Sequence, residues 1–123
     1  MKKIKYLIVG SLVIFITLGC ERAALPESFK TLTVEEAKIE LNNDDSIILI
    51  DVRTEEEYAE DHLDGSILIP IDELEARINL EILDKNIRIF VYCQSGKRSE
   101  EASKILVGLG YKNVYNIKGL DYW

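Results

Sequence analysis

The sequence predicts an α/β fold, with a mostly parallel central sheet flanked by helices on both faces. Two apolar runs, residues 46–52 and residues 87–92, have the composition of strands that are buried on both sides, and only Arg88 interrupts the second run. Other segments, such as residues 99–109, repeat their apolar residues at helical spacing. Strands that alternate with helices are typical of parallel sheets, because a helix carries the chain back to the edge where the next strand begins.

The first two helices are predicted from their N-terminal caps. Thr33 is expected to cap a helix that ends near residue 41. Thr54 and Glu57 have the spacing of a capping box at the start of a second, short helix. We expect that short helix to carry its acidic residues, 55–60, on a solvated face.

The second half of the chain continues the alternation. Residues 66–69 are predicted as a short strand that Pro70 stops. Asp72 is expected to cap a helix that ends near residue 80. Gly110 suits the position just after a helix, and residues 113–117 form the last predicted strand.

The turn Cys-Gln-Ser-Gly-Lys-Arg, residues 93–98, joins the central strand to the helix after it. The first amides of a helix lack internal partners, and Gly96 permits the positive φ that directs such amides inward. Lys97 and Arg98 add two positive charges. Because helix N-termini and nearby cations favour a thiolate, Cys93 is the candidate nucleophile. The alternative is a small apolar cysteine at the end of a core strand, with no chemical role.

The predicted topology brings two motifs to one edge of the sheet. In parallel sheets, ligands bind beyond the carboxyl ends of the strands. Cys93 follows one buried strand, and Asp51 and Arg53 lie at the end of another. We therefore expect these three residues to converge.

The turn resembles the C-x-x-G-x-R active-site loop of single-domain rhodanese-like sulfurtransferases. Residues 51–70 resemble the family's second motif. The resemblance lies in the triplet Asp-Val-Arg and in the pairs Glu-Tyr, His-Leu, Gly-Ser and Ile-Pro. Gly119 and Trp123 resemble its closing motif, in which Lys118 replaces the first glycine. The resemblance covers roughly residues 30–123. It implies a rhodanese-like fold and the transfer of sulfane sulfur, from a donor such as thiosulfate to a thiol or cyanide, through a persulfide on cysteine.

The resemblance also implies roles for single residues, and it implies no cofactor and no metal. Cys93 would be the nucleophile, and the planar fork of Arg98 would hold an oxyanion. Asp51 and Arg53 would brace the loop. The donor would bind to the loop and its backbone amides, at Gln94, Ser95, Gly96, Lys97 and Ser99.

His62 is the only histidine of the chain. In the rhodanese motif this residue packs the turn, so we expect a structural role and not that of a general base. Asp61, which precedes it, stands where the family has glycine.

The spacing within the loop also bears on two other functions. Cysteine phosphatases and arsenate reductases need five residues between cysteine and arginine, and here only four separate Cys93 from Arg98. Their wide oxyanion cradle is therefore disfavoured. A non-enzymatic sulfur carrier or partner-binding module that uses the same loop stays open as an alternative.

Residues 1–20 have the pattern of a secretory signal, with a lysine-rich start followed by an apolar stretch. The stretch ends in Thr-Leu-Gly-Cys, which resembles the lipobox of bacterial lipoproteins and would make Cys20 a lipidation site. The alternative is an uncleaved anchor helix. A disulfide between Cys20 and Cys93 is disfavoured. We expect a linker at residues 21–30 and a domain at residues 31–123. We also expect the protein to be exported and anchored to the membrane of a bacterial cell envelope, on the periplasmic or outer face.

The charge of the chain further limits the classes of molecule that it can bind. The formal net charge is −7, and it is −10 without the three lysines of the leader. An acidic body does not attract nucleic acid by electrostatics. We expect a monomer that acts on small sulfur compounds.

Overall fold

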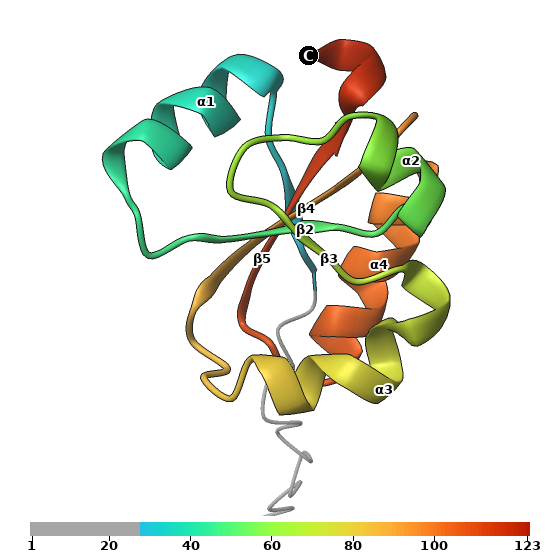
Figure 1. Ribbon diagram of the computed structural model, residues 1–123. Helices are drawn as coiled ribbons and strands as arrows, with labels where there is room; N and C mark the ends of the chain where they lie inside the picture. The colour runs from blue at the N-terminus through green and yellow to red at the C-terminus, as the bar shows by residue number, and fades with distance from the viewer. Residues whose placement is uncertain (1–27) are drawn as a thin grey trace, which may run out of the picture.

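The computed structural model describes residues 28–123, which form a five-stranded sheet with helices on both faces (Figure 1). All neighbouring strands pair in parallel, and their order across the sheet is β1-β5-β4-β2-β3. The predicted α/β class and parallel sheet are thus confirmed. The expected leader, with Cys20 and most of the expected linker, lies outside the described residues. Within residues 28–123, no helix has the length and apolar content needed to cross a bilayer.

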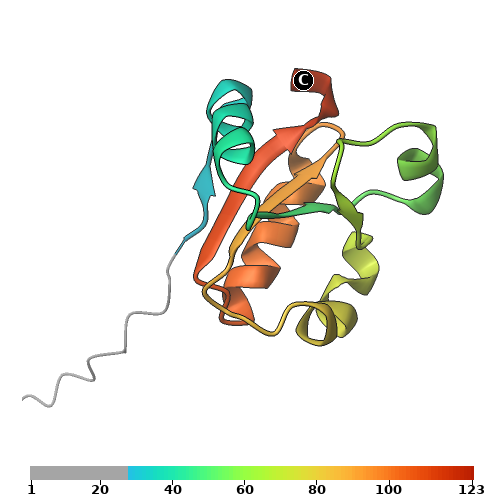
Figure 2. The ribbon, with the colours of Figure 1, turned by 60° about the vertical axis from the view of Figure 1, so that its left-hand side comes forward.

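The sheet separates two layers of helices (Figure 2), with α1 on one face and α3 and α4 on the other. The elements in chain order are β1 (Lys30–Thr31), α1 (Val34–Asn43), β2 (Ile48–Asp51), α2 (Glu55–Glu60), β3 (Ile67–Leu68), α3 (Ile71–Glu81), β4 (Arg88–Cys93), α4 (Lys97–Gly108), β5 (Asn113–Gly119) and the 3-10 turn η1 (Leu120–Tyr122).

The central strand β4 contributes to both cores, because successive side chains of a strand point to opposite faces. Phe90 and Tyr92 belong to the core under α1. Ile89, Val91 and Cys93 belong to the core under α3 and α4. The Cys93 side chain therefore lies at the carboxyl end of the sheet, on the face that α4 covers.

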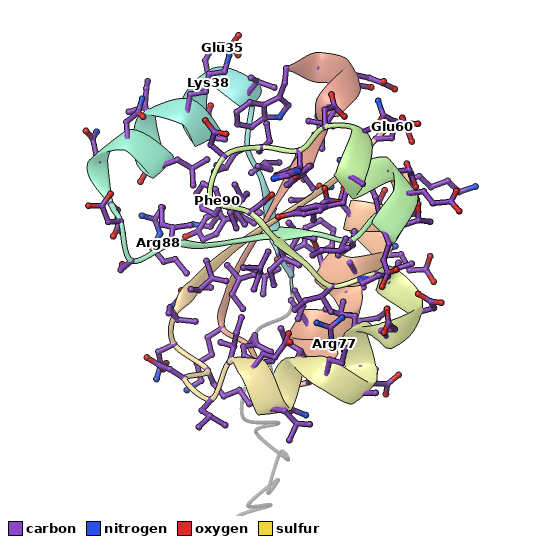
Figure 3. All side chains as sticks on the ribbon, in the orientation of Figure 1. Glu35, Lys38, Glu60, Arg77, Arg88 and Phe90 are labelled. Atoms are coloured by element: carbon purple, nitrogen blue, oxygen red, sulfur yellow. The ribbon has the colours of Figure 1, made fainter. Side chains whose placement is uncertain are left out.

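Arg88, the first residue of β4, connects the sheet to the end of α1 (Figure 3). Its guanidinium binds Glu40 at 2.9 Å and Asp44 at 3.3 Å. It also lies over the rings of Phe90 and Tyr115, 5.5 and 5.3 Å from their centroids. The single charge that interrupts the predicted strand is thus paired at the sheet surface.

The helix caps largely follow the sequence. Thr33 accepts the predicted bond from the first turn of α1, and Thr54 and Glu57 form the predicted capping box of α2. The predicted cap at Asp72 is wrong, because α3 begins at Ile71 with Pro70 in the N-cap position. Proline has a fixed φ and no N–H donor, so it suits a helix start, and Asp72 instead lies in the first turn, where the helix dipole favours its charge.

The boundaries near the predicted loop also shift. β4 includes Cys93, and α4 begins at Lys97, so two residues assigned to the turn lie in the helix. β5 continues to Gly119. The short strand β1 was not predicted, because two residues carry no periodic pattern, and its first residue, Lys30, was assigned to the linker.

Gly119 marks the closest approach between β5 and the predicted loop, and it supplies a test of the fold. A methyl group there would overlap the backbone carbonyl of Gln94, so the two segments would have to separate. We expect Gly119→Ala to lower the free energy of unfolding by about 2–3 kcal/mol. Urea denaturation followed by circular dichroism measures this change.

The matched control is Gly108→Ala. Nothing lies within 4 Å of the place where its Cβ would stand, and the residue is helical. Alanine there should raise the free energy of unfolding by about 0.5–1 kcal/mol. Unchanged stability in Gly119→Ala would contradict the close approach.

Candidate functional site

The turn after β4 wraps around the sulfur of Cys93. Gly96 has the positive φ that the sequence predicted, +99°, and its N–H donates to Sγ at 3.0 Å. The first helical bond of α4 runs from the Glu100 N–H to the Gly96 carbonyl. The amides of residues 97–99 precede that bond and have no carbonyl partner within the helix. The backbone therefore presents several donors at one end of α4, beside the thiol.

Cys93 is completely buried. Its thiol lies 3.4 Å from the hydroxyl oxygen of Ser99. A molecule that reacts with Sγ must therefore displace part of the loop or of the side chains around it. The predicted nucleophile is in place, but access to it depends on movement.

Ser99 joins the thiol to the end of β5. Its hydroxyl lies 2.8 Å from Asn116 Oδ1 and 2.9 Å from the Lys118 carbonyl. Lys118, which replaces the family's glycine, has a φ of +66°, and its N–H donates to the same Asn116 oxygen. The Lys118 backbone lies 3.4 Å from where a Cβ of Gly96 would be, so two left-handed residues pack against each other.

Asp51 and Arg53 form a buried ion pair at the end of β2. Their closest approach, from Nη2 of Arg53 to Oδ2 of Asp51, is 2.8 Å, and the Arg53 Nε lies 3.1 Å from both carboxylate oxygens. The exposed fractions of the side chains are 2% and 0%. Burial opposes the charge of Arg53, but the bonds to Asp51 outweigh it and raise the pKa of the guanidinium.

The remaining donors of Arg53 connect this pair to two loops. Nη2 donates to the backbone carbonyl of Asp61 at 2.7 Å, and Nη1 donates to Oε1 of Gln94 at 3.2 Å. The structure thus brings Asp51, Arg53 and the loop of Cys93 together. Asp61 contributes through its backbone, so the family's glycine at that position is not required for this contact.

Arg98 is held by Glu57, a contact that the sequence did not reveal. The guanidinium makes two parallel bonds to the carboxylate, 2.6 and 2.9 Å long. Glu57, which we expected on a solvated face, is therefore only partly exposed, with 30% of its side chain accessible. The capping box accounted for Glu57 locally, and its second partner is 41 positions away. The role of Arg98 as an oxyanion ligand stays a prediction, because here its fork is occupied.

Tyr92 is a second residue that the sequence missed, because its apolar run indicated only a strand. Its hydroxyl accepts the Leu63 N–H at 3.0 Å and lies 2.9 Å from the Ser66 hydroxyl. Burial raises the pKa of Tyr92 to about 12, so the phenol stays protonated. It fixes the turn between α2 and β3.

His62 packs that turn, in keeping with the expected structural role. Its ring stacks on Tyr58, with centroids 3.7 Å apart, and Nδ1 lies 2.7 Å from the Tyr58 carbonyl. Among residues 28–123, no group of three or more histidine, cysteine, aspartate or glutamate side chains could hold a metal ion.

The ion pair of Glu57 and Arg98 makes a testable contribution to stability. The hydrogen bond from Arg98 lowers the pKa of Glu57 from 4.5 to about 2. A carboxylate with a lowered pKa stabilises the fold above pH 4.5, and this stabilisation is lost as the pH falls towards 2. We expect Glu57→Gln to be about 1 kcal/mol less stable than the wild type at pH 7, with no gap at pH 2.

Urea denaturation at a series of pH values measures that gap. Glu56→Gln, an exposed neighbour on the same helix, is the control and should stay within about 0.5 kcal/mol of the wild type throughout. A gap for Glu57→Gln that does not change with pH would contradict an ionic origin.

Comparisons with known proteins agree with this geometry. The family model of the rhodanese-like domain matches residues 33–123. The thiosulfate sulfurtransferase PspE of Escherichia coli is 44% identical over 71 residues, which are 58% of this chain and 68% of that protein. The putative sulfur carrier protein YrkF of Bacillus subtilis is 36% identical over 97 residues, or 78% of this chain, and the match spans about half (51%) of its length.

Solved structures show the same fold. A rhodanese with anions from E. coli has 40% identity and a TM-score of 0.60, over 63% of this chain and 91% of that one. The Alr3790 protein from Anabaena has 26% identity and a TM-score of 0.70, over 75% of this chain and 73% of that one. The matched family, the parallel sheet and the loop around Cys93 agree with one another, and the chain belongs to the rhodanese-like family.

Proposed function

We propose that this chain is an enzyme that transfers sulfane sulfur from a donor such as thiosulfate to a thiophilic acceptor, through a persulfide on Cys93. The observation that carries the proposal is the position of Sγ at the start of α4, 3.0 Å from the Gly96 amide. Amide donors around a sulfur atom stabilise a thiolate, which is the form that attacks sulfur. They would also stabilise the anionic donor.

The proposed reaction has two displacement steps. The Cys93 thiolate attacks the outer sulfur of thiosulfate, a new S–S bond forms, and sulfite leaves with the electron pair of the broken bond. An acceptor such as cyanide or a thiolate then attacks the outer sulfur of the persulfide. That sulfur departs on the acceptor, as thiocyanate or a new persulfide, and Cys93 returns as a thiolate.

The side chains of the loop have different parts in this proposal. The amides of residues 94–99 bind the donor and the terminal sulfur of the persulfide. Arg98 adds positive charge beside Cys93, although Glu57 balances part of it. Lys97 is exposed and would contribute to the field at the entrance. Asp51 and Arg53 hold the loop in position through Gln94.

The names of the relatives support the proposal at the level of the family. PspE is named a thiosulfate sulfurtransferase, and YrkF is named a putative sulfur carrier protein. The second name supports one alternative function. In this alternative, Cys93 holds sulfur and passes it to a partner protein without catalysing turnover of small molecules.

Thiosulfate treatment followed by intact mass spectrometry tests the persulfide. We expect one added sulfur on Cys93, and turnover of thiosulfate with cyanide. Cys93→Ser should lose both, while Cys20→Ser, which removes the only other cysteine, should keep both. Turnover that survives in Cys93→Ser would remove Cys93 from the mechanism, and a persulfide without turnover would favour the sulfur carrier.

The location of the protein is a separate proposal, which rests on the sequence of residues 1–20. We propose that the chain acts as a monomer in a bacterial cell envelope, tethered to the membrane by lipid on Cys20. Two acyl chains would suffice for stable attachment. Mass spectrometry of protein extracted from membranes should show a lipid adduct on Cys20 at a new N-terminus. A free N-terminal Met1 would contradict processing.

A further inference from the structure

The complete burial of Cys93 means that something must move before a donor or acceptor can reach the sulfur. Two sets of side-chain contacts hold the loop to the rest of the carboxyl edge of the sheet. One is the ion pair between Arg98 and Glu57. The other runs from Arg53 through Gln94 to Asp121.

The side-chain amide of Gln94 is bound at both of its ends. Oε1 accepts from Nη1 of Arg53 at 3.2 Å, and Nε2 donates to Oδ1 of Asp121 at 2.6 Å. The Asp121 N–H also donates to the Gln94 carbonyl at 3.1 Å. Asp121 therefore binds Gln94 twice and ties the C-terminal turn η1 to the first residue of the loop. Both residues occupy variable positions of the motifs that indicated the family.

The C-terminal segment also touches the loop directly. Gly119, just before η1, lies so close to the Gln94 carbonyl that no side chain fits between them. The Ser99 hydroxyl, beside Sγ, contacts the Lys118 carbonyl in the same segment. A displacement of η1 would therefore be transmitted to the backbone at Gln94 and to the Ser99 hydroxyl beside Sγ.

The two sets of contacts differ in strength. Arg98 and Glu57 are both charged and meet in a bidentate pair, and the pKa of Glu57 is lowered to about 2. The side chains of Gln94 and Asp121 share one hydrogen bond, and Asp121 is exposed to solvent. Opening this side-chain contact breaks one hydrogen bond, whereas releasing Arg98 breaks two at once, so the contact between Gln94 and Asp121 opens more often.

We propose that Asp121 is a positioning residue that sets the size of the molecules able to reach Cys93. While Asp121 holds Gln94, the loop opens only far enough to admit small donors and acceptors. When it releases Gln94, bulkier acceptors, such as a thiol on another protein, gain access. This inference rests on the proposed function only in taking Cys93 as the reacting group.

Alkylation of Cys93 in the full chain tests the inference without requiring sulfur transfer. The Cys20→Ser background leaves Cys93 as the only thiol. Two reagents with the same reactive group are compared, N-ethylmaleimide and a maleimide that carries a polyethylene glycol chain. We expect Asp121→Ala to raise the rate for the large reagent about tenfold, and the rate for the small one less than twofold.

Two further variants separate this role from simple loosening of the fold. Gln94→Glu keeps an oxygen for Arg53 but places a carboxylate opposite Asp121, so it should behave like Asp121→Ala. Asp121→Asn keeps an oxygen acceptor and should stay within about twofold of the parent for both reagents. Asp45→Ala, an exposed aspartate in the turn after α1, should change neither rate.

Three results would overturn the inference. Equal acceleration of both reagents in Asp121→Ala would mean general loosening. Unchanged rates for both reagents in that variant would mean that Asp121 does not control access. If the Asp121→Asn variant reacted like the Asp121→Ala variant, the hydrogen bond would be excluded as the cause of the restricted access. A failure of the proposed function would look different, because no persulfide would form with thiosulfate while the ratio of alkylation rates still changed.

Discussion

The buried ion pair of Asp51 and Arg53 is the interaction on which the carboxyl edge of the sheet depends. Arg53 places nearly all of its donors on fixed partners, which are Asp51, the Asp61 carbonyl and the Gln94 side chain. Removal of one member of a buried pair leaves an uncompensated charge, at a typical cost of about 3–5 kcal/mol. The pair therefore fixes the end of β2, the turn after α2 and the loop around Cys93 relative to one another.

Because of the charge balance at the site, backbone amides are the main source of positive potential at the Cys93 sulfur. Glu57 balances part of the charge of Arg98, and the protein as a whole carries a formal charge of −7. The Gly96 amide, by contrast, points at Sγ and cannot be neutralised by a mobile carboxylate. In an acidic protein, oriented peptide dipoles supply positive potential at one atom without attracting anions to the rest of the surface.

The sequence predicted what local chemistry determines, and it missed what depends on distant contacts. The caps at Thr33 and Thr54 and the positive φ of Gly96 follow from single residues and their neighbours, and the structure confirms them. The bonds from Arg98 to Glu57 and from Gln94 to Asp121 join positions 41 and 27 residues apart, so no window of sequence contains them. The place of Cys93 at the end of a core strand was apparent from the sequence, but its complete burial also depends on the residues around the loop, such as Ser99.

The parallel sheet has one further consequence. β1 is the first strand and runs in the same direction as β4, and its residues Lys30 and Thr31 pair with Tyr115 and Asn116 of β5 (Figure 1). Phe29 and Thr31 line a surface pocket together with Gly96 and Lys97, so the start of the domain lies beside the loop that follows Cys93. A molecule that occupies this pocket would touch the first strand as well as the reactive loop.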